Sequence, residues 1–355
     1  MPHRCIVIGA SAGGLEPLKE MVSRFPSDLP APVFVVMHVP AYLPSYLPEI
    51  LRKVGRLPAI HPEDNRRTEV GFIYVAPPDH HLLVDDGYMA VKRGPKENGF
   101  RPSIDALFRS AAYSYGPAAI GVVLSGALND GTSGLWSIKR LGGIAIVQDP
   151  FQAAFPSMPR SALEFIEADY RLPAAEIGDL LVQLAREQVT HGVTLGEDIE
   201  ENLQRMAKEL HIAAGINVSE QSILDLGPLT PFTCPECKGS LVKIKEGNMS
   251  RFRCHTGHGF TADALLEAAT KMVGEQIWQV TRGLQEAEML LNHMGQHLQE
   301  GGRQAEAEKY FAKARELSVR ASHYQNDALF HETLSSEKLD QQEPIDEPQE
   351  SGTDD

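Results

Sequence analysis

Long apolar runs and an excess of positive charge are both missing from this 355-residue sequence. No stretch approaches the roughly 18 uninterrupted apolar residues that a membrane helix needs, so we expect no direct membrane insertion. We also expect no signal peptide, because the apolar run Cys5–Ile8 is short and leads into a glycine loop. A formal net charge of −15 argues against nucleic acid or an anionic membrane as the main partner. These absences predict a cytoplasmic protein.

Cysteine is scarce too, since the chain has only four. Cys5 lies in an apolar, strand-like run and is expected to be a small buried side chain. The other three lie within 21 residues of one another, beside histidines. In a reducing compartment this grouping favours a metal site over disulfide bonds.

Two short motifs contain these cysteines, Cys234-Pro-Glu-Cys237 and Cys254-His-Thr-Gly-His258, with sixteen residues between them. Three thiolates and one imidazole suit tetrahedral Zn²⁺, and four protein ligands leave no open position for catalysis. The predicted ligands of a structural zinc ion are Cys234, Cys237, Cys254 and His258, and His255 is the competing fourth ligand. A ribbon this small needs a metal to fold. The alternatives are a metal-free remnant and a redox dithiol, which is disfavoured because no thioredoxin-like βαβ unit surrounds it.

Short apolar runs alternate with amphipathic stretches over the first half of the chain. The runs are bounded by Gly, Pro or His and predict buried strands at Cys5–Ile8, Val33–Met37, Gly71–Ala76, Ile120–Leu124 and Ile144–Val147. The helix candidates among them are Leu15–Arg24, Ser45–Val54, Ser103–Ser114 and Gly134–Leu141. This alternation predicts an α/β fold with a doubly wound, mainly parallel sheet covered on both faces. A hairpin signal at His81–Val91 adds an antiparallel ribbon.

Three polar residues each follow one of the predicted strands. Ser11 lies in a glycine-flanked turn before a helix, whose N-terminal N–H groups can bind an oxyanion. His38 ends the second strand and can supply the base that a serine hydroxyl needs at neutral pH. Asp130 lies in a turn rich in Gly and Asn and can orient that histidine. Ligands bind at the carboxyl ends of parallel strands, so the three together predict a nucleophilic site.

Each of these residues alone has an ordinary alternative. The serine turn can be a phosphate-binding loop, although its glycine spacing does not match the dinucleotide motif and no Gly-Lys-Ser/Thr follows. The histidine can be a structural strand-end residue, and Asp-Gly is ordinary turn chemistry. The combination favours a serine hydrolase.

The three segments resemble those of the CheB-type protein-glutamate methylesterases of bacterial chemosensory systems, over about residues 4–185. That family has a Gly-Ala-Ser-x-Gly-Gly loop with the nucleophile, a His-x-Pro strand end with the base and an Asn-Asp-Gly loop with the aspartate. Further similar stretches are Tyr74–His81, Arg101–Phe108, Gln148–Pro150 and Met158-Pro159. As a set these motifs are highly specific.

The resemblance implies that Ser11 attacks the γ-methyl ester of a receptor glutamate, with His38 as the base and Asp130 holding the imidazole. Methanol leaves and water resolves the acyl-enzyme, and the family also deamidates glutamine. The implied oxyanion-hole donors are the backbone N–H groups of Ala12 and Ala127, where many members have Thr and Met. The resemblance implies no cofactor for catalysis. Its implied partners are a methylated chemoreceptor or another signalling protein, and a methyltransferase of the same pathway.

Typical members of the family begin with a phosphorylatable receiver domain. Because this sequence opens at the catalytic strand, we expect a stand-alone form without that switch. One alternative function is a non-catalytic scaffold that docks a signalling partner on the esterase fold, but the intact set of three residues favours the enzyme. A small-molecule esterase is the other alternative, and it should have a deep apolar pocket instead of an open groove.

The sequence predicts five parts in this chain. They are residues 1–189 (catalytic domain), 190–230 (partly helical linker), 231–261 (zinc-ribbon-like module), 262–334 (helical hairpin) and 335–355 (acidic tail). Leu241–Ile244 and Ser250–Arg253 are the expected ribbon strands. Two apolar stripes of helical spacing flank Gly301-Gly302, which predicts an antiparallel pair of helices. The tail has eight acidic residues and one lysine and is expected to be disordered, with no specific partner required.

Overall fold

A computed structural model describes residues 3–189, 197–216, 223–335 and 338–339. The chain divides into two units, Met1–Leu265 and Leu266–Asp355. Within the described residues, no helix combines the length and the apolar character that crossing a membrane requires. The predicted disordered tail lies almost wholly outside these residues.

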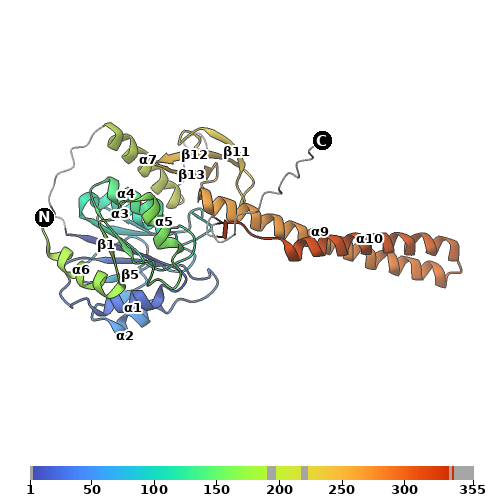
Figure 1. The fold of residues 1–355 in the computed structure, drawn as a ribbon, viewed down its shortest axis with the longest axis horizontal. Coiled ribbons are helices and arrows are strands. Elements are labelled where there is room, and N and C mark those ends of the chain that lie inside the picture. Colours follow the sequence, from blue (N-terminus) through green and yellow to red (C-terminus); the bar gives the residue numbers. More distant parts are fainter. Residues whose placement is uncertain (1–2, 190–196, 217–222, 336–337, 340–355) are drawn as a thin grey trace, which may run out of the picture. The chain divides into compact units, whose positions relative to one another are not determined.

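A seven-stranded parallel sheet lies at the centre of the first unit (Figure 1). Its strands, in spatial order, are β10 (Tyr170–Leu172), β9 (Ile144–Gln148), β8 (Ala119–Val123), β1 (Cys5–Ala10), β2 (Val33–Met37), β5 (Ile73–Val75) and β3 (Ala59–Ile60). The five predicted strands are all present, which confirms the mainly parallel sheet. The sequence pattern does not predict β3 and β10, because edge strands of two and three residues are too short to show a periodicity.

The strand order reverses at β1. From β1 the chain moves outward through β2 to the edge strand β3, adds β5 between these two, and then returns to place β8 on the other side of β1. The connections that leave β1 and β8 therefore run in opposite directions, which makes the carboxyl ends of these two strands a topological switch point. Open parallel sheets bind their ligands at such a switch point.

Helices cover both faces of the sheet, as the figure shows (Figure 1). One face carries α1 (Leu15–Ser23), α2 (Leu47–Val54) and α6 (Ala174–Arg186), and the other carries α3 (Ile104–Tyr115), α4 (Thr132–Arg140) and α5 (Ser157–Phe165). Alternate residues of β1 point to opposite faces. Ile6 and Ile8 therefore belong to the hydrophobic core under α1, α2 and α6, and Val7 belongs to the core under α3, α4 and α5. The sequence pattern does not predict α5. A 3₁₀ helix, η1 (Gly116–Ala118), follows α3.

A second, antiparallel sheet contains β4 (Arg66–Arg67), β7 (Tyr88–Lys92) and β6 (His81–Asp85). Strands β6 and β7 form the predicted hairpin. Its turn has positive φ at both Asp86 and Gly87, the conformation that two-residue hairpin loops prefer. This confirms that an antiparallel hairpin interrupts the βα alternation.

The remaining part of the first unit packs on the α3 side of the sheet. Helix α7 (Glu197–Ala213) contacts α3 and buries Met206 in the core, so the predicted linker region contains a packed helix. A four-stranded antiparallel sheet follows, and we call it the ribbon. It contains β11 (Leu229–Thr233), β12 (Ser240–Glu246), β13 (Met249–Cys254) and β14 (Gly259–Thr261). The five-part division of the chain stays a prediction.

Two long helices make up most of the described part of the second unit. Helix α9 (Ala262–Glu300) begins at the end of the first unit, and α10 (Gln304–Phe330) follows after a short turn. His331 Nε2 lies 2.7 Å from the Thr270 carbonyl oxygen, while Gly295 faces Phe311, so the helices run antiparallel. Every seventh residue of α10 is a buried alanine, at 307, 314, 321 and 328, which lets the two backbones approach closely.

Candidate active site

The three predicted site residues meet at the switch point of the parallel sheet. Strand β1 pairs with β2 on one side and with β8 on the other. Ser11 directly follows β1, His38 directly follows β2, and Asp130 lies in the loop between β8 and α4. Parallel strands present their carboxyl ends at one edge, so the fold alone brings the three side chains together.

The turn that contains Ser11 requires glycine. The Ser11 N–H donates to the Ser125 carbonyl at 3.0 Å, and Gly13 has φ of 68° in the left-handed region. A Cβ atom on Gly13 would approach Ala154 Cβ to 2.8 Å and Phe155 Cδ2 to 2.9 Å. Only glycine combines this backbone conformation with so little space, and the resulting turn leaves the Ser11 side chain half-buried at the sheet edge.

A chain of hydrogen bonds joins the three side chains. His38 Nδ1 lies 3.1 Å from Ser11 Oγ, and His38 Nε2 lies 2.9 Å from Asp130 Oδ2. An ionised carboxylate only accepts hydrogen bonds, so Nε2 carries the proton and Nδ1 is free to accept one from the serine hydroxyl. The His38 and Asp130 side chains are only 5% and 1% exposed, so both interactions lie largely out of contact with water.

Asp130 is held by donors from the start of α3. Its Oδ2 accepts from the Ile104 N–H at 2.7 Å, and its Oδ1 accepts from Ser103 Oγ at 3.0 Å and from Asn98 Nδ2 at 2.9 Å. Burial alone would raise the pKa of Asp130, but the hydrogen bond and charge of His38 and the donors of Ile104 and Asn98 lower the pKa below its ordinary value. Asp130 therefore stays an anion that can stabilise an imidazolium.

A second carboxylate, Asp105, lies beside Asp130. Its Oδ1 accepts from the N–H groups of Gly131 and Gly134, and its Oδ2 accepts from Asn98 Nδ2 at 2.9 Å. Burial first, and the charge of Asp130 second, raise the pKa of Asp105 well above its usual value. Asp105 thus holds the end of this loop and the first turn of α4, directly after Asp130, and Asn98 bridges the two carboxylates.

The backbone N–H groups of Ala12 and Ala127 lie in the two loops beside Ser11. Neither donates a hydrogen bond to another group of the described residues. Gly126, the residue before Ala127, lies close to Ser11 and Met158, since a Cβ atom on it would be 2.8 Å from Ser11 Cβ and 2.1 Å from Met158 Sδ. Leu128 has φ of 62°, a conformation that non-glycine residues adopt rarely and often at functional sites. The two free donors are suited to bind an oxyanion.

The sequence does not predict several of the side chains at this site. Phe100 stacks on the His38 ring with centroids 3.7 Å apart and planes 6° apart. Ser103 caps α3, and its hydroxyl also contacts Asp130. Ser103 and Asp105 fall inside one of the family-like stretches, whereas the only signal at Asn98 is an Asn-Gly pair, which indicates an ordinary turn.

The Cys/His cluster lies in the ribbon and includes Cys234, Cys237, Cys254 and His258. Their ligand atoms all lie within 4.8 Å of one another. The Cys237–Cys254 sulfur separation is 3.6 Å, and His258 Nδ1 lies 3.5 Å from Cys254 Sγ. A tetrahedral zinc site needs roughly 3.8 Å between two sulfurs and roughly 3.6 Å between sulfur and nitrogen. The donor set and its spacing therefore fit Zn²⁺, whereas the His255 ring lies against Gly239 outside the cluster.

Comparison with known proteins matches residues 6–181 to the CheB methylesterase family. A relative from Leptospira interrogans is 39% identical over 185 residues, which are 52% of this chain and 96% of that protein. The chain belongs to the CheB methylesterase family. The Leptospira relative is provisionally named a protein-glutamate methylesterase/protein-glutamine glutaminase.

Other CheB relatives are longer. The protein-glutamate methylesterase/protein-glutamine glutaminase of Hydrogenovibrio crunogenus is 34% identical over 52% of this chain, but the match covers only 50% of that protein. The crystal structure of the Thermotoga maritima CheB methylesterase catalytic domain superimposes with a TM-score of 0.50 at 34% identity, over 52% of this chain and 100% of that domain. The CheB match contains Ser11, His38 and Asp130, whereas the ribbon and the two long helices lie beyond it.

Proposed function

We propose that this protein is a serine hydrolase that cleaves glutamate γ-methyl esters on other proteins. The observation that carries the proposal is the hydrogen-bonded chain from Ser11 through His38 to Asp130 at the switch point of a CheB fold. Ser11 Oγ adds to the ester carbonyl carbon while His38 Nδ1 takes the hydroxyl proton. Asp130 stabilises the imidazolium that forms, through its bond to Nε2.

The tetrahedral intermediate places its negative oxygen against the N–H groups of Ala12 and Ala127. When it collapses, His38 gives its proton to the departing methoxy group, methanol leaves and the glutamyl group remains esterified to Ser11. Water, deprotonated by the same histidine, then attacks this ester and releases a glutamate carboxylate and free Ser11. A glutamine side chain would follow the same path with ammonia as the leaving group, in line with the names of both relatives.

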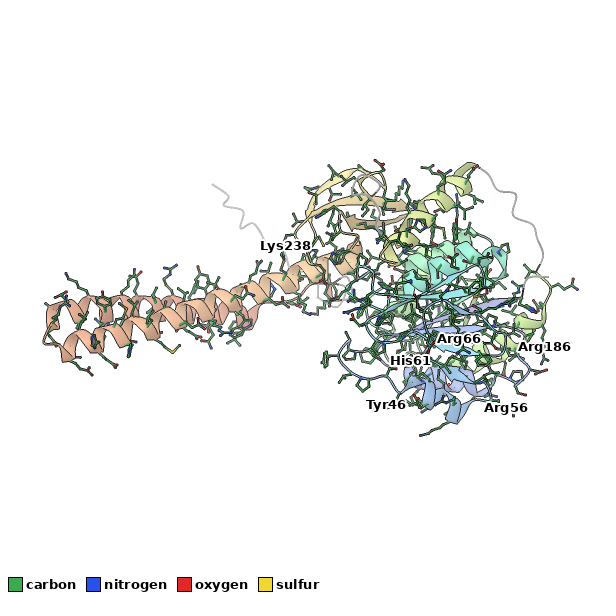
Figure 2. The ribbon with its side chains drawn as sticks, turned by 180° about the vertical axis from the view of Figure 1, so that it is seen from behind. Tyr46, Arg56, His61, Arg66, Arg186 and Lys238 are labelled. Carbon is green, nitrogen blue, oxygen red and sulfur yellow. The ribbon has the colours of Figure 1, made fainter. Side chains whose placement is uncertain are left out.

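Exposed aromatic side chains on the loops that follow β2 and β9 support a protein substrate. Tyr42 and Phe151 are each 85% exposed, and Phe155 lies against the Ser11 turn. Tyr46, labelled in Figure 2, is exposed at the start of α2. These loops follow strands whose carboxyl ends share the sheet edge with Ser11, and exposed apolar groups there suit contact with another protein surface better than entry of a small molecule.

A methylated chemoreceptor is the partner that the family membership favours, although another methylated signalling protein has the same chemistry. Since the substrate is a methyl ester, a methyltransferase that acts on the same glutamates must supply it. We place this reaction in the cytoplasm, because a Cys/His cluster of this kind is typical of a reducing compartment, where thiols bind metal and do not form disulfides.

We further propose that the Cys/His cluster holds a structural Zn²⁺ ion through Cys234, Cys237, Cys254 and His258. The proposal is supported by a donor set that suits zinc and by separations close to those of a tetrahedral site. Four protein ligands would fill the coordination sphere, so the ion would stabilise the ribbon and take no part in ester cleavage.

The experiment that tests the esterase function compares substrates. Purified full-length protein is incubated with a methylated chemoreceptor signalling fragment, with its glutamine form and with a small glutamate methyl ester, while methanol or ammonia is measured. We expect release from the two protein substrates, abolished by Ser11→Ala and unaffected by Ser23→Ala on α1. Cleavage of the small ester alone would contradict the protein-substrate assignment, and no release from any of the three would contradict the function.

A further inference from the structure

One tight turn, residues 97–100, connects the candidate active site with the ribbon. The Glu97 N–H donates to the Phe100 carbonyl at 3.2 Å, and the Phe100 N–H donates back at 2.9 Å. Its two central residues, Asn98 and Gly99, have φ of 53° and 81°. Asn and Gly tolerate this left-handed conformation, so the two residues suit a tight turn that is closed by two backbone hydrogen bonds.

The turn touches two of the three proposed catalytic residues. Asn98 Nδ2 donates to Asp130 Oδ1, and the ring of Phe100 stacks on the ring of His38. A shift of the turn would therefore move the partner of the histidine and the histidine itself. Because a misplaced catalytic group lowers the rate steeply, the position of this turn matters to the reaction.

Strand β14 of the ribbon holds the other side of the turn. The Asn98 N–H donates to the Gly259 carbonyl at 2.8 Å, and the Thr261 N–H donates to Asn98 Oδ1 at 2.8 Å. Thr261 Oγ1 donates to Asn129 Oδ1, also at 2.8 Å, and Asn129 is the residue before Asp130. Thr261 and Asn98 are both buried, so water cannot easily replace these hydrogen bonds.

A buried cluster of charges attaches the ribbon around this contact. Three arginines and three glutamates take part, and they are Glu97, Arg109, Glu209, Glu246, Arg251 and Arg253. All six side chains are buried, and a fourth arginine, Arg205, pairs with Glu246 at 3.3 Å from a more exposed position. In addition, Ser133 Oγ at the start of α4 donates to Glu246 at 2.7 Å. The ribbon therefore contacts α4 directly through Ser133, and it is linked to Arg109 of α3 through the shared partners Glu97 and Glu209.

We propose that the ribbon is a working part of the esterase site and that Asn98 and Thr261 are positioning residues for Asp130 and His38. This inference rests on the function proposed above. Thr261 orients the Asn98 amide by donating to its oxygen, which leaves the amide N–H₂ aimed at Asp130. It also fixes Asn129, so the loop with the catalytic aspartate is held from two directions by one ribbon residue.

The test measures kcat and KM for methanol release by the full-length protein. Asn98→Gly removes the amide while keeping a residue that tolerates φ of 53°, so the turn should still form. We expect kcat to fall about tenfold with KM within about twofold of wild type, because the amide acts on Asp130 and not on the substrate. Asn65→Gly is the matched control, since Asn65 has φ of 60° and is exposed on a distant loop.

A second pair of variants tests the contact from the ribbon side. Thr261→Val removes the hydroxyl that bonds Asn129 and should also lower kcat, whereas Thr261→Ser keeps a hydroxyl and should restore most of it. Thermal unfolding shows that each variant is folded. The proposal is overturned if folded Asn98→Gly and Thr261→Val retain the wild-type kcat, or if Val and Ser at 261 have equal effects. If the wild-type protein releases no more methanol than Ser11→Ala does, the proposed esterase function itself is contradicted.

Discussion

Arg253 and Glu97 are 156 positions apart in the sequence, yet they form a buried ion pair with a nitrogen–oxygen distance of 2.9 Å. Their side chains are only 1% and 3% exposed. Arg253 lies in the ribbon, and Glu97 lies in the turn that contacts the candidate active site. This one ion pair shows that the ribbon and the CheB fold share an interior.

Removal of Arg253 should destabilise the first unit severely. Arg253→Ala would leave the buried side chains of Glu97 and Glu209 with fewer partners, and breaking such a buried pair costs roughly 3–5 kcal/mol. Urea unfolding followed by circular dichroism measures the loss. Arg186→Ala is the control. Arg186, labelled in Figure 2, forms an exposed ion pair with Asp28, so its removal should change stability by less than about 0.5 kcal/mol. If the two substitutions change the free energy of unfolding equally, the buried charge cluster contributes no more to stability than a surface ion pair.

The same cluster predicts how stability depends on pH. Burial alone would raise the pKa of Glu97, but the charges of Arg109 and Arg253 lower it to about 2. An unfolded glutamate titrates near 4.3, so the unfolded chain binds protons at a higher pH than the folded one. The stabilisation is therefore complete above about pH 5 and is lost as the pH falls toward 2. Thermal midpoints measured over this range should fall more steeply for wild type than for Glu97→Gln; parallel curves would contradict the prediction.

Zinc content should depend on one histidine and not on its neighbour. His258→Ala removes a proposed ligand, so we expect it to lose bound zinc and to lower the unfolding temperature. His255→Ala should keep about one zinc per chain, because that ring lies against Gly239 outside the cluster. Atomic absorption after dialysis against a chelator gives the metal content. Retention of zinc by His258→Ala together with its loss from His255→Ala would reverse the proposed ligand set.

Gly126 should be essential for the position of the nucleophile. Gly126→Ala would place a methyl group against Ser11 and Met158, so the Met158 side chain must repack and either the serine turn or the Gly126 loop must shift. We expect kcat for methanol release to fall more than about tenfold, since small displacements of a nucleophile are costly. Gly283→Ala on α9 is the matched control, because an added Cβ there meets nothing within 4 Å and helix propensity should improve. An unchanged kcat in Gly126→Ala would mean that the loop adapts without moving Ser11.

Much of this fold can be predicted from the sequence, because buried parallel strands leave continuous apolar runs. The strand ends alone place Ser11, His38 and Asp130 at one edge of the sheet, before any distance is known. Helix α5 is the clearest failure within this part. It is short and its stretch opens with Ser157-Met158-Pro159, so it lacks the long helical stripe that marks α9.

The docking of the ribbon could not be predicted in this way. In β13, Arg251 and Arg253 alternate with Phe252, a pattern that indicates a strand with one face in water. Both arginines are nevertheless buried, because glutamates from α7 and from the 97–100 turn neutralise them. Such pairing joins residues far apart in the chain, and no local pattern encodes it. For the same reason Asn98 shows only a turn signal, although its partner Thr261 lies 163 positions later.

The most direct test of the central claim is the rate of methanol release from a methylated chemoreceptor fragment by Ser11→Ala relative to wild type, both at equal folded concentration. We expect the rate to fall by at least about a thousandfold, because Ser11 Oγ is the hydroxyl that lies against His38 Nδ1. Release by Ser11→Ala at the wild-type rate would contradict the assignment of Ser11, and with it the mechanism derived from the bonds among Ser11, His38 and Asp130.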